Sequence, residues 1–284
     1  MNESTASPRA PSLRDDRILA PTKWLAALII PFLVAAFYIL YLRPNETGEL
    51  FAWRIAPTMT AMMLASAYLG GIYYFTGVLL ARRWHHVKAG MLPVAAFASI
   101  LGVATILHWD RFTPGHVSFV TWTTLYWVAP FLVIGAWLRN RVHDPGTPDA
   151  DDARIPIAWR WAIGCFGLVT LVFCLLLFLQ PAPMIAAWPW KLTPLTARVE
   201  AALFALPAVV GLGLALDSRW SSARLIVQAQ AFSIVFILIA AVRAWSEFDR
   251  SSPGTYAFVG GMGLTLAAIV AFHVVMEARR APRP

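Results

Sequence analysis

Arg250-Ser251-Ser252-Pro253 is the stretch that decides the fold, because the chain contains four versions of it. The other three are Arg54-Ile55-Ala56-Pro57, Arg111-Phe112-Thr113-Pro114 and Lys191-Leu192-Thr193-Pro194. Each version has a basic residue, two spacers and a proline, and a long apolar run follows it. An arginine ends each run, 25 residues after the proline in three copies and 26 in the fourth. At about 1.5 Å per helical residue this spacing covers about 37 Å, the apolar thickness of a bilayer plus part of each interface.

The composition also favours a membrane protein. The 284 residues are 59% hydrophobic and 13% charged, with a mean hydropathy of +0.63, whereas soluble domains carry about 25% charged residues. The net charge of +8 does not indicate nucleic acid, because the basic residues stand singly or in pairs at the ends of apolar runs. The two cysteines, Cys165 and Cys174, lie in one apolar run, and no Cys/His cluster indicates zinc. We therefore expect neither a metal nor a cofactor.

Eight apolar runs are long enough to cross a bilayer, so the sequence predicts an all-α integral membrane protein. Sixteen of the 23 basic residues fall on the side that holds both chain ends, which places the N- and C-termini in the cytoplasm. The spans then form four tandem helical hairpins, and every proline-led helix enters from the outer face. We expect two four-helix halves related by an axis along the membrane normal, and a looser fourfold ring also fits. The predicted spans are Trp24–Leu42, Pro57–Ala81, Met91–Leu107, Pro114–Leu138, Ile157–Leu179, Pro194–Leu216, Leu225–Val242 and Pro253–Met276.

The predicted organisation has five parts. Residues 1–22 are expected to be a disordered cytoplasmic tail, 23–142 the first four-helix half, 143–156 a cytoplasmic linker, 157–277 the second four-helix half and 278–284 a basic C-terminal tail. The first apolar run follows about twenty polar residues, so it is not a signal peptide. The expected location is the plasma (inner) membrane, and the Arg- and Ala-rich composition favours a bacterium.

The basic motif residues Arg54, Arg111, Lys191 and Arg250 form the first candidate binding site. A helix start exposes unpaired N–H groups and a partial positive charge, so a basic residue beside it favours an anion. If the four starts converge, they would attract a carboxylate, a phosphate or a lipid headgroup. The alternative is that each residue only anchors its span at the interface. Acidic residues directly before two of the arginines weaken the anion site.

Arg198 and Glu200 form the second candidate, because they break the repeat. The other three copies have no charge at the equivalent positions. Charges inside a span are costly and usually face the bundle interior or water. Residues two apart point about 200° away from each other, so each is expected to find a partner on another helix. Glu200 is then either a proton or cation site or a structural residue.

Three further groups are weaker candidates. Gln228 and Gln230 are expected to join helices, while His273 and Glu277 share one helix face. His85-His86 lies in a basic turn and is expected to be solvated or bound to lipid phosphate. Glycines cluster in the even-numbered spans, where they favour close packing or bending, so we expect those spans to form an inner ring.

The motifs exclude several functions. No nucleotide-binding, hydrolase or metalloprotease motif is present, so the sequence predicts no enzyme. The first predicted function is a transporter or permease-like protein with a polar or anion/lipid-headgroup site near the outer leaflet, which takes a small anionic or zwitterionic solute. The alternative is a non-catalytic membrane subunit or scaffold that packs against a partner protein or another copy of itself. A membrane enzyme for lipid-linked substrates is a third reading. Membrane lipids are expected partners and nucleic acid is not.

Overall fold

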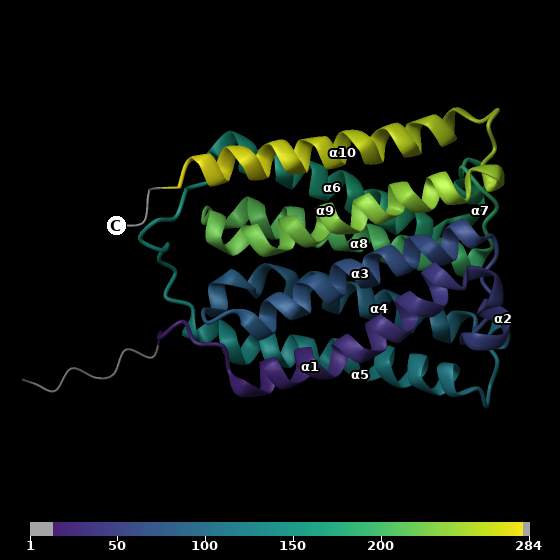
Figure 1. The fold of residues 1–284 in the computed structure, drawn as a ribbon, viewed down its shortest axis with the longest axis horizontal. Helices are drawn as coiled ribbons and strands as arrows, with labels where there is room; N and C mark the ends of the chain where they lie inside the picture. The colour runs from purple at the N-terminus through teal and green to yellow at the C-terminus, as the bar shows by residue number, and fades with distance from the viewer. Residues whose placement is uncertain (1–13, 281–284) are drawn as a thin grey trace, which may run out of the picture.

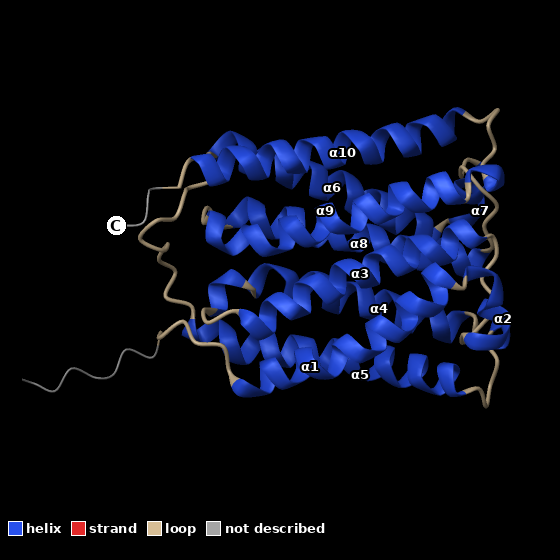
Figure 2. Ribbon diagram, viewed as in Figure 1, coloured by secondary structure: helices blue, strands red, loops and turns tan. Residues whose placement is uncertain are grey.

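The computed structural model describes residues 14–280, and the regular elements in that range are all helical (Figure 2). Eight of these helices are long and apolar enough to cross a membrane, so the protein is a multi-pass membrane protein. The helices run side by side along the long axis of the molecule (Figure 1). We call the end that holds both ends of the described chain the termini end. The opposite end holds the four basic-x-x-proline motifs, and we call it the motif end.

The spanning helices begin and end close to the predicted positions. Three have the predicted bounds, because their apolar runs start or stop at a proline, a glycine turn or a polar residue: α4 (Met91–Leu107), α6 (Ile157–Leu179) and α8 (Pro194–Leu216). The others are α1 (Ala20–Phe37), continued by a π-helical turn over Tyr38–Leu42, and α3 (Thr58–Leu80), α5 (Val117–Asn140), α9 (Trp220–Arg243) and α10 (Pro253–Ala278). Two short helices lie at the motif end, α2 (Thr47–Leu50) and α7 (Pro181–Ala186).

Three helix starts differ from the prediction by three residues or more. Helix α9 starts at Trp220 instead of Leu225, and α1 starts at Ala20 instead of Trp24. The predicted start of α5 is Pro114, but the helix begins three residues later, at Val117. Gly115 has a φ of +87°, a conformation that interrupts a right-handed helix. The new start is capped by the His116 side chain, which accepts a hydrogen bond from the Ser118 N–H at 3.2 Å.

Residues 14–22, which we expected in a disordered tail, belong to the folded body. The Asp16 N–H donates to the His143 carbonyl at 2.9 Å, and the Leu19 N–H donates to Asn140 Oδ1 at 2.9 Å. Helix α1 then starts at Ala20. These bonds to distant residues fix a polar segment that no local pattern marks as ordered. The rest of the predicted N-terminal tail, residues 1–13, and residues 281–284 lie outside the described residues.

The eight helices pack in two rows of four, which Figure 1 shows one behind the other. One row runs α1, α3, α9, α10 and the other α5, α4, α8, α6, and each helix contacts the next in its row. The predicted inner ring of even-numbered spans is therefore wrong for two of them. The fourth and eighth spans, α5 and α10, lie at the edges, while the third and seventh, α4 and α9, are central. Helix α10 contacts little besides α9, and only 6% of the residues in its 18-residue apolar stretch are buried.

The same kind of backbone contact occurs twice at the termini end, between residues whose equivalents lie 136 or 137 positions later in the sequence. The Trp84 N–H donates to the Asp16 carbonyl at 2.7 Å, and the Trp220 N–H donates to the Ala153 carbonyl at 3.0 Å. Both tryptophans are fully buried. In chain order the spanning helices fall into two groups of four: α1, α3, α4, α5 and α6, α8, α9, α10. In each group the segment before the first helix pairs with the segment after the second helix.

Side chains repeat the same pattern. Lys23 on α1 donates from Nζ to the carbonyls of Leu79 and Ala81, at the C-terminal end of α3. Arg160, 137 residues later on α6, donates to the carbonyl of Ala215 at the C-terminal end of α8, at 2.6 and 3.0 Å. Carbonyls in the last turn of a helix lack backbone partners, so each cation satisfies the same need in its own group.

The motif end shows the recurrence as well. The Trp53 and Phe112 rings lie 4.9 Å apart, and the Trp190 and Phe248 rings lie 5.1 Å apart. All four side chains are buried. Each aromatic pair joins the loop before the second helix of a group to the loop before the fourth.

Candidate functional site

Arg198 lies near the motif end of α8 and is bound on two sides. Its Nε donates to the Phe178 carbonyl at 3.1 Å, and its guanidinium lies 5.8 Å from the centre of that ring. Its Nη1 is 2.7 Å from Nε2 of His108, which follows α4. Arginine only donates, so His108 Nε2 accepts and the imidazole is held neutral. Desolvation and the nearby positive charge of Arg198 both lower the pKa of His108.

Glu200, two residues further along α8, has a different environment. Its side chain is 0% exposed, and neither carboxyl oxygen has a hydrogen-bond partner among residues 14–280. The expectation that each charge finds a partner on another helix is therefore correct for Arg198 and wrong for Glu200. Burial of a carboxylate without a partner is strongly unfavourable, and a neutral carboxylic acid costs much less. Such a group needs an explanation beyond packing.

A cavity lies beside α8, one turn along the helix from Glu200. Leu203, one turn further into the span, lines a cavity of about 130 Å³ between α3, α6, α8, α9 and α10. Residues three apart share a helix face, so Glu200 belongs to the face that borders this space. The cavity wall is apolar except for a few side chains, among them Gln230 and Ser233 of α9. Gln230 also lines two neighbouring cavities, and its side-chain amide has no hydrogen bond to the described residues.

The four motif cations lie in loops at the motif end, and all four side chains are exposed. A shared binding site for an anion stays a prediction. Arg111 pairs with its neighbour Asp110, at 3.1 Å. The residue after the cation is the buried part of the motif in three copies, namely Ile55, Phe112 and Leu192. In these three copies the motif thus packs an apolar side chain into the protein and leaves its cation exposed.

The N-terminus of α3 does bind an anionic group, which is a carboxylate of the protein itself. Glu247, in the loop before α10, accepts hydrogen bonds from the backbone N–H groups of Thr58 and Met59 at 3.0 and 2.8 Å. It also accepts one from the Thr58 hydroxyl at 2.7 Å. The N-cap residue of α3 is Pro57, whose side chain has no hydrogen-bond acceptor, so this helix start has no side-chain cap of its own. The carboxylate of Glu247 fills this place and joins the two groups of four helices.

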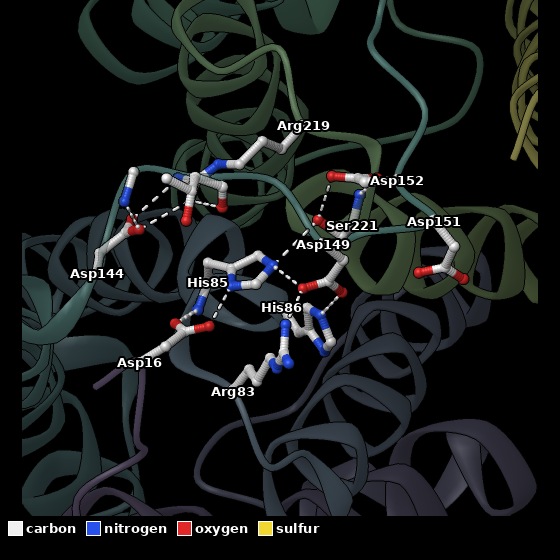
Figure 3. A network of polar contacts seen from close by, with 12 residues as sticks. Asp16, Arg83, His85, His86, Asp144, Asp149, Asp151, Asp152, Arg219 and Ser221 are labelled. Carbon is white, nitrogen blue, oxygen red and sulfur yellow. Dashed lines mark hydrogen bonds and ion pairs between the residues drawn. The ribbon is translucent and has the colours of Figure 1, made fainter. Parts of the chain in front are cut away.

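A polar cluster joins the loops at the termini end (Figure 3). Asp16 accepts from the His85 N–H at 3.0 Å and contacts His85 Nδ1 at 2.5 Å. Asp152 accepts from the Ser221 N–H at 2.8 Å and from the Ser221 hydroxyl at 2.6 Å. The two aspartates thus hold residues that are 136 positions apart in the same way. His85 Nε2 and Ser221 Oγ then meet at 3.1 Å.

Two more side chains complete this cluster. Asp149, in the connection between α5 and α6, lies 2.7 Å from His86 Nε2 and 3.3 Å from His85 Nε2, and it also binds Arg83. His85 is 1% exposed, so the expectation that His85-His86 is solvated or bound to lipid phosphate is wrong for His85. The two imidazole nitrogens and one Asp149 oxygen lie within 4.8 Å of one another, a spacing that can hold a metal ion.

A second group of charges at this end is fully paired. Arg219 donates to Asp144 at 2.8 and 3.0 Å and to Asp217 at 3.0 and 2.9 Å. Lys88 binds the same two aspartates at 2.8 and 2.7 Å. Burial alone would raise the pKa of Asp144 and Asp217, but hydrogen bonds from Arg219 and Lys88 outweigh it and hold both pKa values well below the ordinary range. The group ties the loops after α3, α5 and α8 together.

The weaker candidates have mostly structural partners. The side-chain amide of Gln228 lies 2.9 Å from His273 Nε2, which joins α9 to α10 as expected. Glu277 accepts from Trp220 Nε1 at 2.6 Å and pairs with Arg224 at 2.8 Å.

Sequence reasoning missed the cluster around His85 because its members come from four separate segments. The only signal was the concentration of aspartates and basic residues in the loops of one side. Comparison with protein-family models, with curated proteins and with solved structures found no match.

Proposed function

We propose that this protein is a membrane transporter of two related halves, in which Glu200 is the group that binds a proton or cation during transport. The observation that carries the proposal is the complete burial of the Glu200 carboxyl without a hydrogen-bond partner. Ionisable residues inside a membrane usually mark a proton or substrate pathway. Leu203, one turn from Glu200 on the same face of α8, lines a cavity between helices of both halves. Transporters with parallel repeats place their sites where the halves meet.

The recurring contacts support the two-half arrangement. Residues 14–143 and 153–280 each contribute four spanning helices, arranged as two hairpins: α1 with α3 and α4 with α5, then α6 with α8 and α9 with α10. The halves meet where α3 contacts α9 and where α4 contacts α8. A twofold axis along the helices exchanges these two interfaces, as expected for parallel repeats. Relative movement of the halves would open or close the space beside Glu200.

The basic residues support an orientation with the termini end in the cytoplasm of a bacterial cell and the motif end outside. Arg198 and His108 then lie near the outer leaflet. A half-buried guanidinium held next to a neutral imidazole favours an anionic group, so the proposed substrate is a small anionic or zwitterionic solute or a lipid headgroup. The exposed cations Arg54, Arg111, Lys191 and Arg250 would raise the local concentration of such anions at the outer surface.

A carbodiimide experiment tests the role of Glu200 without knowledge of the substrate. Dicyclohexylcarbodiimide enters apolar regions and modifies protonated carboxyl groups. We expect it to label Glu200 in membranes at neutral pH, as mapped by peptide mass spectrometry, and Glu200→Gln to abolish that label. Glu49→Gln is the matched control, because Glu49 is exposed at the motif end.

Transport itself is measured in proteoliposomes that contain a pH-sensitive dye. Small anions and zwitterions are offered one at a time, and the wild type should move protons with at least one of them. Glu200→Gln should abolish the coupled proton movement, and Glu49→Gln should leave it intact. The absence of both carbodiimide labelling and substrate-dependent proton movement in a folded protein would rule out this function.

The second candidate function is a membrane subunit that packs against another protein, and helix α10 favours it. Among the described residues, apart from the neighbouring backbone of α10 itself, no atom lies within 4 Å of a Cβ added at Gly260, Gly261 or Gly263. Leu264 and Tyr256 on the same helix are 75% and 60% exposed. Small residues usually allow close helix contact in membranes, but no helix among the described residues packs against these glycines of α10. Purification in mild detergent followed by mass spectrometry would show a stoichiometric partner or a second copy if α10 is an interface.

A further inference from the structure

We propose that His85, His86 and Asp149 bind a divalent transition-metal ion such as Zn²⁺ at the termini end, with Asp16 as the residue that orients His85. This inference does not depend on transport. The ligand set of two imidazole nitrogens and one carboxylate oxygen suits zinc and similar ions, and it suits calcium and magnesium poorly.

The orientation of His85 is the first argument. Its Nδ1 contacts an Asp16 oxygen at 2.5 Å, and its backbone N–H donates to the other oxygen at 3.0 Å. Nδ1–H therefore donates a hydrogen bond to the Asp16 carboxylate. The lone pair of the imidazole is then on Nε2 and points away from Asp16. Histidines that bind metals are usually held in this way by a carboxylate or a carbonyl.

The contacts of His85 Nε2 are the second argument. This nitrogen lies 3.3 Å from Asp149 Oδ1, so that two lone pairs face each other. The other Asp149 oxygen is 2.7 Å from His86 Nε2, and the two imidazole rings are 4.4 Å apart at an angle of 77°. In a tetrahedral site with bonds of about 2.0–2.1 Å, ligand atoms lie about 3.3 Å apart. Small side-chain movements would bring all three atoms to this spacing around one ion.

Charge is the third argument. Asp16, Asp149 and Asp152 bring three negative charges to the cluster, and Arg83 is the cation bound to Asp149. With neutral imidazoles, one guanidinium leaves two negative charges without a counter-charge, and a divalent ion would balance them. Arg280 and Arg224 are close by, but they pair with Asp151 and Glu277.

The site also has room for a fourth ligand. A polar cavity of about 210 Å³ borders His86, Asp149 and Ser221. Water can reach the fourth position from this cavity, or Ser221 Oγ, 3.1 Å from His85 Nε2, can approach it. A bound ion would join the loop after α3 to the connection between α5 and α6, beside the start of α9. It would therefore fix the connection between the two halves to the first half at the termini end.

The test uses the full-length protein in detergent, without a histidine tag and stripped of metal by a chelator. Co²⁺ is titrated as a spectroscopic substitute for Zn²⁺, and Zn²⁺ affinity is measured by competition with a zinc indicator. We expect about one equivalent of Co²⁺ to give the visible absorption of a four-coordinate site, and Zn²⁺ to remove it. Zn²⁺ should also raise the unfolding temperature of the wild type.

Four variants locate the site. His86→Ala and Asp149→Asn remove ligands at partly exposed positions and should abolish the absorption and the thermal shift. Asp16→Asn should keep the spectrum and weaken Zn²⁺ binding by about 10–100-fold, as loss of an orienting carboxylate does. His143→Ala, which removes another histidine at the same end, should bind like the wild type. Size-exclusion profiles and unfolding temperatures without metal show whether each variant is folded.

Two results would overturn the proposal. One is a wild-type protein that gives no four-coordinate Co²⁺ spectrum although it is folded. The other is a folded His86→Ala or Asp149→Asn variant that binds as tightly as the wild type, which would mean adventitious surface binding. In either case the cluster is a set of hydrogen bonds with protons in place of an ion.

Discussion

His85 Nε2 lies 3.1 Å from Ser221 Oγ, and the two residues hold equivalent places in the two groups of four helices. Each follows a fully buried tryptophan, and each is bound through its backbone N–H and its side chain by an aspartate from the segment before the first helix of its group. One half thus carries an imidazole where the other carries a hydroxyl. Because equivalent residues meet at a twofold axis, the proposed axis between the halves passes through this contact at the termini end.

The first prediction concerns the equivalent cations Lys23 and Arg160. Each donates to carbonyls at the end of the next spanning helix, so Lys23→Ala and Arg160→Ala should each lower the free energy of unfolding by about 1 kcal/mol. The exchanges Lys23→Arg and Arg160→Lys should cost less, because each position needs only a donor of similar reach. Thermal unfolding in one detergent measures all four. Alanine variants without effect would show that the two contacts are incidental.

The second prediction concerns the cap that Glu247 provides for α3. Glu247→Ala removes the acceptor of two backbone N–H groups and one hydroxyl, and it should destabilise the protein by about 1–2 kcal/mol. Glu49→Ala, at an exposed site of the same end, should have almost no effect. Urea or thermal unfolding provides the measurement. Equal stability of the two variants would contradict the role of Glu247 as a cap.

The third prediction concerns the stability of Glu200 variants. Because neither oxygen has a partner, Glu200→Gln and Glu200→Leu should leave the unfolding temperature unchanged or raise it. Arg198→Leu, in contrast, removes donors to Phe178 and His108 and should lower it. A large loss of stability in Glu200→Leu would mean that Glu200 is a structural residue with partners that the described residues do not include.

The fourth prediction concerns acid. The pKa values of Asp144 and Asp217 are held below the ordinary value of about 3.9, so their contribution to stability is complete above about pH 5. It should be lost as the pH falls below about 4 and protonation breaks the bonds to Arg219 and Lys88. Unfolding temperatures measured from pH 7 to pH 3 should show this decline in the wild type. Asp217→Asn should be less stable at pH 7 and decline less in acid, and a parallel decline would contradict the assignment.

The sequence predicted the helices well because each span is a continuous apolar run bounded by polar residues or proline. It predicted the start of α5 less well, because Pro114 looks like a helix start and the conformation of Gly115 decides otherwise. The order of the helices in the bundle was harder to predict. The hydropathy of α10 is 2.0 and lies inside the range of 1.4 to 2.7 that the eight spans cover, so its exposed position could not be predicted from its composition.

Glycines illustrate the same limit. Gly70 and Gly211 lie in tight contacts, against Ser233 and Gly167, as close packing predicts. Gly213, Gly260, Gly261 and Gly263 have open space around them in the described structure. A glycine in a membrane helix allows a close neighbour, but the neighbour must come from elsewhere in the chain or from another chain.

The candidate site shows what sequence can and cannot reveal. Glu200 was found because it breaks the repeat, and its burial agrees with a special role. Its lack of a partner was not foreseen, nor was His108 as the partner of Arg198, 90 residues away. The cluster around His85 depends on contacts over 63 to 136 residues, and no local spacing in the sequence encodes them.

The proposals for Glu200 and Arg198 require that the motif end faces the outside of the cell and the termini end faces the cytoplasm. Single cysteines test this directly in a chain that carries Cys165→Ser and Cys174→Ala. In intact cells, a membrane-impermeant maleimide should label Ser246→Cys at the motif end, and it should label Ala150→Cys at the termini end only after the cells are permeabilised. Labelling of Ala150→Cys from the outside of intact cells would contradict the account.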